Sequence, residues 1–277
     1  MNRFEVAHPS TVAEASELLQ SEDAKALAGG QTLIPTMKQR LAAPSRLVRL
    51  AGIAEMRGLR HEDNRLIIGA STTHATVARV CAAYPALAAL AGGIGDPAVR
   101  NRGTIGGSLA NNDPSACYPS AVLASDATII TDRRKIQSDA FFQGVFTTAL
   151  EHSEIITAVD FPIPDRAAYI KFEQPASRFA LVGVFVAKSG ASVRVAITGA
   201  GEDGVFRWAH AEAALEKDYS PASLDALDPP DEAMMADLFG TKEYRAHIAK
   251  VLTKRAVASS QHTPGSRFDE TIEAGGE

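Results

Sequence analysis

The segment from Gly92 to Gly107 contains six glycines in 16 residues, a density that no regular element readily tolerates. Average glycine usage is about 7%, and glycine inside a helix or strand is destabilising because its backbone loses the most freedom on folding. We therefore predict a long, shaped loop here. Because glycine lets a backbone approach a ligand closely, this loop is the first candidate for a functional site.

Two turns, at residues 28–32 and 103–108, each place adjacent glycines beside a hydroxyl residue. Without a Cβ, successive backbone N–H groups can point into one concavity and bind phosphate oxygens, and a following helix N-terminus adds its positive end. One such turn alone is better explained as an ordinary tight turn of the chain. Two of them can hold the two phosphoryl groups of a diphosphate. A Cβ branch at Gly106 is then expected to fill the diphosphate approach and to leave the chain folded.

Neither turn matches a standard nucleotide motif. No Gly-Lys-Ser or Gly-Lys-Thr follows, so the lysine of a Walker loop is missing. Residues 93–98 come closest to Gly-x-Gly-x-x-Gly, but Pro97 and the glycines that follow disfavour a Rossmann helix. The pattern favours a diphosphate-containing cofactor in a non-Rossmann cradle over ATP hydrolysis. Arg100 and Arg102 in the same loop are consistent with a solvated pair, with phosphate neutralisation or with contacts to a partner's carboxylates.

Length and charge narrow the class of protein. The 277 residues are enough for two domains, each with its own core. A formal net charge of -5 argues against general affinity for nucleic acid or anionic membranes. The N-terminus lacks an apolar signal region and no stretch of about 18 apolar residues occurs, so we predict a protein that is neither exported by a standard signal nor membrane-spanning.

Cysteine and histidine content excludes several kinds of site. Two cysteines, Cys81 and Cys117, cannot build a disulfide framework or a four-thiolate iron–sulfur cluster, and they favour reduced thiols in the cytoplasm. The histidines show no metal-ligand spacing, and His74, at a predicted helix start, fits a structural role better than catalysis. We assign no catalytic residue and no metal ligand. Phe172 and Phe179, which flank a Pro-Ala-Ser turn, are expected to pack in the core, with a ligand platform as the alternative.

Hydrophobic periodicity and turn residues give a coarse secondary structure. The opening 50 residues alternate strand and helix, and the proline-containing stretch at 162–166 is the candidate domain boundary. The last 18 residues carry almost nothing to bury, so we expect a mobile tail. Strands are predicted at residues 4–6, 26–28, 46–50, 65–70, 127–131, 155–161, 168–172, 181–187 and 192–198. Helices are predicted at residues 11–19, 33–41, 73–80, 85–90, 119–124, 209–217, 231–239 and 241–257.

Three stretches carry a resemblance to a known family. Residues 28–33 read Ala-Gly-Gly-Gln-Thr-Leu, residues 95–114 begin Gly-Asp-Pro-Ala-Val-Arg-Asn-Arg-Gly-Thr-Ile-Gly-Gly-Ser, and residues 175–180 read Pro-Ala-Ser-Arg-Phe-Ala. Across about residues 1–258 the sequence resembles the FAD-binding medium subunit of molybdenum hydroxylases. That group includes aerobic carbon monoxide dehydrogenase and the flavin domain of xanthine dehydrogenase, and the long second stretch is highly specific to it.

The resemblance implies an α+β fold. Residues 1–165 would form a two-subdomain FAD-binding domain of the PCMH/vanillyl-alcohol-oxidase-like type, with subdomains at about 1–55 and 56–165. Residues 166–258 would form a C-terminal domain of a three-stranded sheet with helices, and residues 259–277 a flexible tail. FAD would lie extended between these parts.

Carried over position by position, the family's cofactor contacts fall mainly on the two glycine turns. Ile94 would line the cofactor channel, Ile156 would lie near the adenine, and Lys171 or its neighbours would approach the isoalloxazine. Cys117 stands where family members often carry Asp. The implied cofactor-binding residues are Leu27, Ala28, Gly29, Gly30, Gln31, Thr32, Leu33, Ile94, Thr104, Ile105, Gly106, Gly107, Ser108, Asn112, Asp113, Cys117, Ile156 and Lys171.

In the family, electrons pass from a molybdenum-cofactor subunit through a small subunit with two [2Fe-2S] clusters to FAD. The resemblance therefore implies the FAD-carrying electron-transfer subunit of a heterotrimeric molybdenum hydroxylase, in a dimer of heterotrimers, which passes electrons to a terminal acceptor. The molybdenum-cofactor large subunit and the small [2Fe-2S] subunit would be separate partner chains. Two alternatives stay open: a self-contained FAD-dependent oxidoreductase, and a flavin-free scaffold that joins partner subunits.

Overall fold

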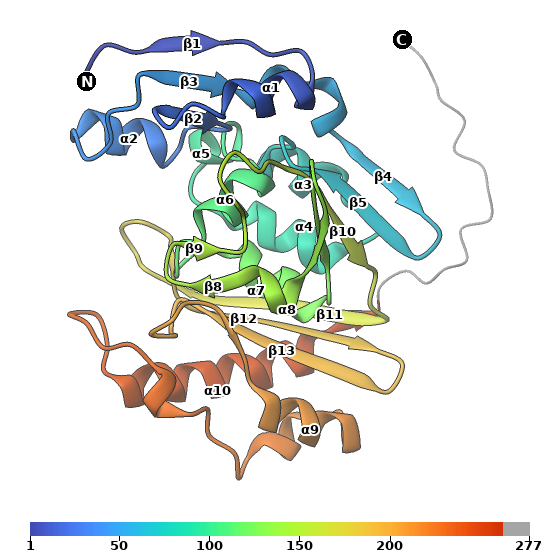
Figure 1. Ribbon diagram of the computed structural model, residues 1–277. Coiled ribbons are helices and arrows are strands. Elements are labelled where there is room, and N and C mark those ends of the chain that lie inside the picture. The colour runs from blue at the N-terminus through green and yellow to red at the C-terminus, as the bar shows by residue number, and fades with distance from the viewer. Residues whose placement is uncertain (263–277) are drawn as a thin grey trace.

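The computed structural model describes residues 1–262, in which three larger β-sheets follow one another along the length of the molecule (Figure 1). The N-terminal sheet lies at the top, the second sheet in the middle, and the third sheet below with two helices beneath it. Most of the predicted tail, residues 263–277, lies outside the described residues. Within residues 1–262, no helix is long and apolar enough to cross a membrane.

The N-terminal sheet is parallel, with the order β1-β3-β2, and its strands alternate with helices as predicted. The hydroxyl of Thr11 accepts a hydrogen bond from the N–H of Glu14 at 3.2 Å, so the capping-box spacing in the sequence does begin a helix. The elements of this part are β1 (Glu5–Ala7), α1 (Val12–Leu18), β2 (Ala24–Leu27), α2 (Leu33–Lys38), β3 (Arg46–Arg49) and the 3₁₀ turns η1 (Leu50–Gly52) and η2 (Ala54–Met56).

The second sheet is antiparallel, with the order β4-β5-β10-β6-β7. Its strands are β4 (Leu59–Glu62), β5 (Arg65–Gly69), β6 (Thr128–Thr131), β7 (Lys135–Gln137) and β10 (Ile156–Pro162). The chain between them forms α3 (His74–Val80), α4 (Pro85–Gly92), α5 (Pro97–Arg100), α6 (Ile105–Asn111), α7 (Tyr118–Ala124), α8 (Ser138–Phe141) and the hairpin of β8 (Phe142–Gly144) and β9 (Thr147–Thr148). Of these, α4 and α7 contact the third sheet.

The glycine-dense segment is not the uninterrupted loop that the sequence predicted, because α5 lies within it and α6 begins in it. Asp96 accepts a hydrogen bond from the N–H of Val99 at 2.9 Å, and Pro97 takes the first position of α5. Thr104 accepts from the N–H of Gly107 at 3.2 Å and so caps α6. Capping thus starts two short helices that the glycine content argued against.

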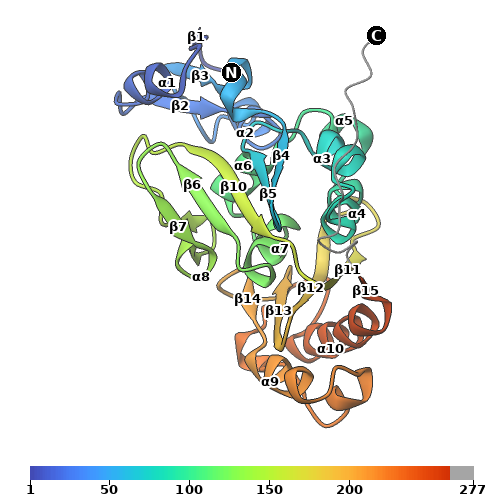
Figure 2. The same cartoon turned by 90° about the vertical axis from the view of Figure 1, so that its right-hand side faces the viewer.

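The third sheet is antiparallel, with the order β14-β13-β12-β11-β15. The three predicted strands are its centre, and two-residue strands extend it at both edges. In Figure 2 the helices α9 and α10 cover the face that points away from the second sheet. The elements are β11 (Arg166–Glu173), β12 (Ala180–Ser189), β13 (Ser192–Thr198), β14 (Phe206–Arg207), α9 (Ala209–Lys217), η3 (Pro221–Leu224), η4 (Asp231–Ala233), α10 (Lys242–Ser259) and β15 (Gln261–His262).

The predicted helix at residues 231–239 is wrong. Only η4, a single 3₁₀ turn, is helical there. The chain then pairs with residues 200–201, because the N–H of Met235 donates to the carbonyl of Ala200 at 2.8 Å and Met234 forms a bridge with Gly201. This pairing uses the backbone groups that a continued helix would need, and it buries Met234 completely.

Aromatic packing joins the second and third sheets. Tyr84, fully buried, lies with its ring centroid 6.3 Å from that of Phe161 in β10 and 6.1 Å from that of Phe185 in β12, edge-on to both. Such edge-to-face pairs add to the free energy of burial. The hydroxyl of Tyr84 is paired with that of Ser125 at 2.6 Å, so the ring is buried without an unsatisfied polar atom.

Candidate functional site

A cleft of about 770 Å³ brings the two glycine turns together. This volume lies in the ordinary range for ligand sites, roughly 300–1,000 Å³. Most of the predicted cofactor-binding residues line the cleft: Leu27, Ala28, Gly29, Gly30, Gln31, Thr32, Leu33, Ile94, Thr104, Gly106, Gly107, Ser108, Asp113, Cys117 and Ile156. Ile105, Asn112 and Lys171 are not among the lining residues.

The two turns touch backbone to backbone. A Cβ placed on Gly29 would overlap the carbonyl oxygen of Arg102 and lie 2.7 Å from the Cα of Gly103. Gly30 has a φ of +73°, in the left-handed region that favours glycine. The contact with the second turn therefore requires glycine at residue 29, and the backbone conformation favours glycine at residue 30.

The first turn carries a row of unpaired backbone donors. Within the described residues, the N–H groups of residues 29–33 donate no hydrogen bond, and the first intrahelical bond at the start of α2 runs from Ile34 to the carbonyl of Gly30. Thr32 makes no side-chain capping bond, which leaves its hydroxyl available. These donors belong to residues that line the cleft at the start of α2, where the sequence predicts contacts with phosphate oxygens.

The backbone donors of the second turn are already paired with other groups of the chain. The N–H of Ile105 donates to the carbonyl of Thr72 at 3.2 Å, that of Gly106 to Ala70 at 2.9 Å, and that of Gly107 to the hydroxyl of Thr104. These three groups do not form the second N–H nest that the sequence suggested. The Thr104 hydroxyl, which accepts from Gly107, still has its own hydrogen to donate.

Gly106 faces Ala70, not open space. A Cβ at Gly106 would lie 2.5 Å from the Cβ of Ala70 and 2.8 Å from its carbonyl oxygen, so a branched side chain would push α6 away from the end of β5. The expectation that such a change leaves the fold intact is therefore wrong. Gly107 is the better position, because its Cβ would lie 3.0 Å from the hydroxyl of Thr104 and 3.3 Å from the Cβ of Ala28 in the opposite turn.

His74 packs against the second turn and also lines the cleft. Its backbone N–H donates to the carbonyl of Gly103 at 2.9 Å. Its ring Nε2 lies 2.5 Å from the point that a Cβ on Gly103 would occupy. Burial, helped by the positive charge of Arg100, lowers the pKa of His74 to about 4. The imidazole is therefore neutral near pH 7 and supports the turn, in line with the structural role predicted from the sequence.

Arg100 uses its guanidinium within the chain. Its Nη1 donates to the carbonyls of Ile94 at 3.0 Å and Gly95 at 2.8 Å, and so fixes the segment between α4 and α5 at the edge of the cleft. Arg102 is exposed, and its backbone carbonyl makes the contact with Gly29. The structure therefore gives Arg100 a role that the sequence did not suggest, which is to support the wall of the cleft.

The two cysteines are buried free thiols. Burial raises the pKa of Cys81 to about 12 and also raises the pKa of Cys117, so both are protonated near neutral pH. Cys117 lines the cleft. A protonated thiol there is a poor hydrogen-bond acceptor compared with the carboxylate that the resemblance implies at this position.

Two predicted residues support the cleft from behind. Ile105 is fully buried in the core. Asn112 ends α6 with a left-handed φ of +43°, and its Nδ2 donates to the carbonyls of Gly144 at 2.8 Å and Thr147 at 2.9 Å. It therefore fixes the β8–β9 hairpin beside α6.

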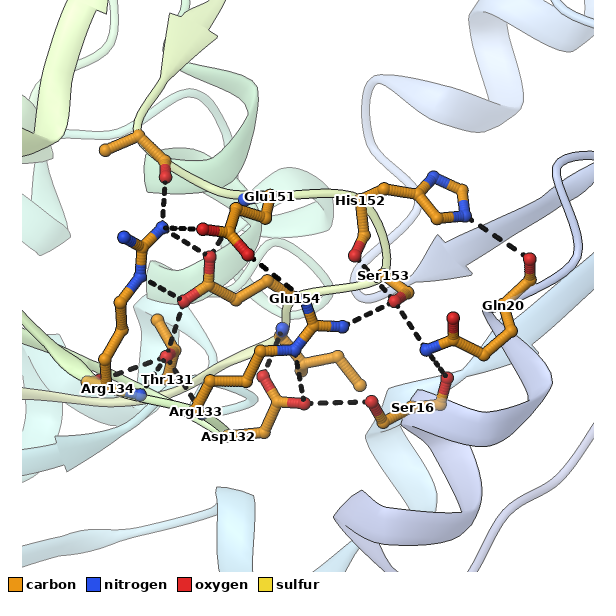
Figure 3. A network of polar contacts seen from close by, with 12 residues as sticks. Ser16, Gln20, Thr131, Asp132, Arg133, Arg134, Glu151, His152, Ser153 and Glu154 are labelled. Atoms are coloured by element: carbon orange, nitrogen blue, oxygen red, sulfur yellow. Dashed lines mark hydrogen bonds and ion pairs between the residues drawn. The ribbon is translucent and has the colours of Figure 1, made fainter.

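Glu154, which the sequence does not predict as a site residue, is a buried carboxylate that lines the cleft. Arg134 holds it through Nε–Oε1 at 3.0 Å and Nη2–Oε2 at 2.9 Å, and the hydroxyl of Thr131 donates to it at 2.8 Å (Figure 3). The hydrogen bonds from Arg134 are the main reason why the pKa of Glu154 falls to about 2. A lone glutamate before an apolar strand carries no sequence signal for such a role.

The same network ties the N-terminal sheet to the second sheet. In Figure 3 the hydroxyl of Ser16 in α1 donates to Asp132 at 2.9 Å, and the side chain of Gln20 donates to the hydroxyl of Ser153 at 2.8 Å. The first bond joins α1 to the turn between β6 and β7, and the second joins the residue shortly after α1 to the segment before β10. The N-terminal part is therefore attached to the second sheet's loops on both sides of Glu154.

Phe172 and Phe179 do not pack in the core as predicted. They are 42% and 53% exposed, and Phe179 lines the cleft together with Ser177 and Arg178. The alternative, an aromatic side chain beside a ligand, is the one that the position of Phe179 favours. Phe172 lies on β11, and the cleft lining does not include it.

Known proteins are similar to this chain in sequence. Residues 2–164 match the family model described as the FAD binding domain in molybdopterin dehydrogenase. The carbon monoxide dehydrogenase medium chain of Hydrogenophaga pseudoflava is 34% identical over 92% of this chain and 96% of that protein. The nicotine 6-hydroxylase medium subunit of Paenarthrobacter nicotinovorans is 32% identical over 92% of this chain and 96% of that protein.

A solved structure also has the same fold. A chain of the carbon monoxide dehydrogenase from Hydrogenophaga pseudoflava, in a form that lacks the Mo-pyranopterin moiety of the molybdenum cofactor, superposes with a TM-score of 0.83 at 35% identity. The alignment covers 93% of this chain and 97% of that chain. The fold is therefore the PCMH-like one that the resemblance implied, and the chain belongs to the family of FAD-binding domains in molybdopterin dehydrogenases.

Proposed function

We propose that this chain is the FAD-carrying electron-transfer subunit of a heterotrimeric molybdenum hydroxylase. The observation that carries the proposal is the cleft of about 770 Å³, which collects both glycine turns and offers the unpaired N–H groups of residues 29–33. The medium chains named above, which align over nearly their whole length, support it. When bound, FAD supplies one-electron and two-electron redox chemistry.

The residues on the two turns suit the diphosphate in different ways. Residues 29–33 provide backbone N–H donors, while Thr104 and Ser108 provide hydroxyls from the other side. Gly107, without a Cβ, leaves the space between Ala28 and Thr104 open. Together these groups bind and orient the cofactor, and the exclusion of water by the cleft strengthens their hydrogen bonds.

The partners belong to the same proposal. A large subunit would carry the molybdenum cofactor and a small subunit two [2Fe-2S] clusters, and electrons would reach the flavin from the small subunit and leave to a terminal acceptor. The complex would be a cytoplasmic dimer of heterotrimers. Two free, buried thiols suit a reducing compartment.

We also propose the domain division predicted from the sequence, with residues 1–165 as the flavin-binding part and 166–258 as the C-terminal part. Two hydrophobic clusters support it, because one draws most of its members from residues 15–163 and the other from residues 168–257. The subdomain boundary near residue 55 falls at the 3₁₀ turns that separate the first two sheets.

The test is to purify the chain alone and together with its co-encoded subunits. The chain alone should bind FAD, release it on denaturation, and show no flavin reduction by organic substrates. The assembled complex should reduce the flavin when its substrate is added. Substrate-dependent reduction by the isolated chain would support the self-contained oxidoreductase instead, and a colourless chain that binds no FAD would support the scaffold.

A further inference from the structure

The side chain of Lys171 is buried although it lies next to the cleft and not in it. Only 8% of the side chain is exposed, and its Nζ donates to the carbonyl of Gly93 at 2.7 Å and to the carbonyl of Arg178 at 2.7 Å. The carboxylate of Glu173 lies 3.4 Å away. A buried ammonium is costly unless its three N–H groups are paired, and here three oxygens surround it.

The two carbonyls come from opposite parts of the cleft edge. Gly93 follows α4 and directly precedes Ile94 and Gly95, which line the cleft. Arg178 belongs to the turn at residues 174–179 between β11 and β12, where residues 177–179 line the cleft. One ammonium thus joins two segments that face the same ligand space.

The Gly93 side of this junction is fixed independently. Arg100 binds the next two carbonyls, those of Ile94 and Gly95. Loss of the Lys171 ammonium would therefore leave the segment at residues 93–95 in place. The other side is the one that depends on Lys171.

The turn at residues 174–179 has few other attachments. Its remaining hydrogen bonds are internal: Gln174 N–H to Phe179 at 2.9 Å, Arg178 N–H to Gln174 at 2.8 Å, and Phe179 N–H to the hydroxyl of Ser177 at 3.3 Å. Apart from the strand ladder at its two ends, no other hydrogen bond within residues 1–262 links it to the rest of the chain. Arg178 also adopts a left-handed φ of +60°, which a non-glycine residue holds only at some cost.

We propose that Lys171 is a positioning residue that clamps the turn at residues 174–179 over the cleft by joining the carbonyl of Arg178 to that of Gly93. Its ammonium does not contact the cofactor directly, in contrast to the role that the resemblance implied. It holds residues 177–179 at the cleft edge, so that they cover a bound flavin. This inference rests on the proposed FAD site.

Trypsin provides a direct readout, because the clamped turn contains its own cleavage site after Arg178. In Lys171→Met the two carbonyls lose their donor, and we expect cleavage after Arg178 to accelerate by about tenfold or more, as measured by mass spectrometry of the full chain without FAD. Lys171→Arg retains a cation and several donors, and should restore slow cleavage at least in part. Lys171→Gln, too short to span both carbonyls, replaces the Met variant if that one does not fold.

Lys250→Met is the matched control. The Lys250 Nζ also binds a backbone carbonyl, that of Asp225 at 2.9 Å, and a carboxylate, that of Asp228 at 3.0 Å, but it lies on α10 away from the cleft. Its loss should leave cleavage after Arg178 unchanged. Equal cleavage rates in wild type, Lys171→Met and Lys250→Met would overturn the clamp.

The second readout concerns the bound flavin. In Lys171→Met, iodide should quench the fluorescence of bound FAD more strongly, and FAD should dissociate about tenfold faster than from the wild type and from Lys250→Met. Faster cleavage with unchanged quenching and unchanged dissociation would show that the turn does not cover the flavin, and would overturn that part of the inference. A wild-type chain that binds no FAD would contradict the proposed function, while the cleavage assay would still decide whether Lys171 clamps the turn.

Discussion

The Cα of Gly103 lies 2.7 Å from the point that a Cβ on Gly29 would occupy. The backbones of the two glycine turns are therefore in direct contact, and any side chain at residue 29 would separate them. His74, which is buried, also contacts Gly103, because its backbone N–H donates to the Gly103 carbonyl. The position of the first turn therefore depends on the contacts that hold Gly103.

Gly107→Val should weaken FAD binding while the chain stays folded. Its Cβ would lie 3.3 Å from Ala28 across the cleft, so the branched side chain must displace either the opposite turn or the ligand. Overpacking of this kind costs about 1–3 kcal/mol, and where the displaced group is the ligand this corresponds to a roughly 5- to 150-fold loss of affinity. FAD titration and thermal unfolding measure the two effects. Gly92→Ala, whose Cβ would meet only Ala78 at 3.8 Å, is the control and should bind FAD normally.

Thr104→Val should lower both stability and FAD affinity. The hydroxyl caps α6, and loss of an N-cap costs about 1 kcal/mol. It also offers a hydrogen to the cleft, so FAD should bind roughly tenfold more weakly. Thr104→Ser keeps the hydroxyl and should restore both properties. Wild-type affinity in the Val variant would show that this hydroxyl does not touch the cofactor.

Glu154→Gln should destabilise the fold by roughly 1.5–3 kcal/mol near neutral pH, because it removes charged hydrogen bonds to Arg134. The pKa of Glu154 is lowered from 4.5 to about 2, so its contribution is present above pH 4.5 and is lost as the pH falls toward 2. Chemical unfolding of wild type and variant at several pH values gives the difference, which should shrink in acid. Glu151→Gln, at a side chain 63% exposed, should change little.

His74 should make stability fall at mildly acidic pH. Its pKa is about 4 in the folded chain against 6.5 when unfolded, so the unfolded state takes up the proton first. The contribution of neutral His74 to the free energy of unfolding is therefore present in full above pH 6.5. It is lost as the pH falls toward 4, and the loss reaches about 3 kcal/mol. In His74→Gln this part of the pH dependence should be missing from unfolding curves. An unchanged slope would assign it to other groups.

The order of strands and helices could be predicted from the sequence because it depends on local patterns. Thr11 with Glu14 gave the first helix, and the alternating apolar runs gave the three central strands of the third sheet. The glycine turns were recognisable because adjacent glycines near a hydroxyl residue form a local pattern.

Other features depend on partners distant in the sequence. Glu154 is informative only because Arg134 and Thr131 meet it, and the failed helix at residues 231–239 gave way to pairing with Ala200. The glycine pattern predicts ligand space beside Gly106, whereas Ala70 occupies it. Residue type alone predicts that Phe179 packs in the core, although its turn places it at the cleft edge.

The unpaired N–H groups of residues 29–33 have a consequence for the amount of this protein in a cell. A ligand that binds only the folded chain raises the free energy of unfolding in proportion to the logarithm of its free concentration. Chains made when flavin is scarce would spend more time unfolded and would be degraded sooner. The supply of the vitamin would then limit how many complexes can assemble, even when every subunit is synthesised in equal number.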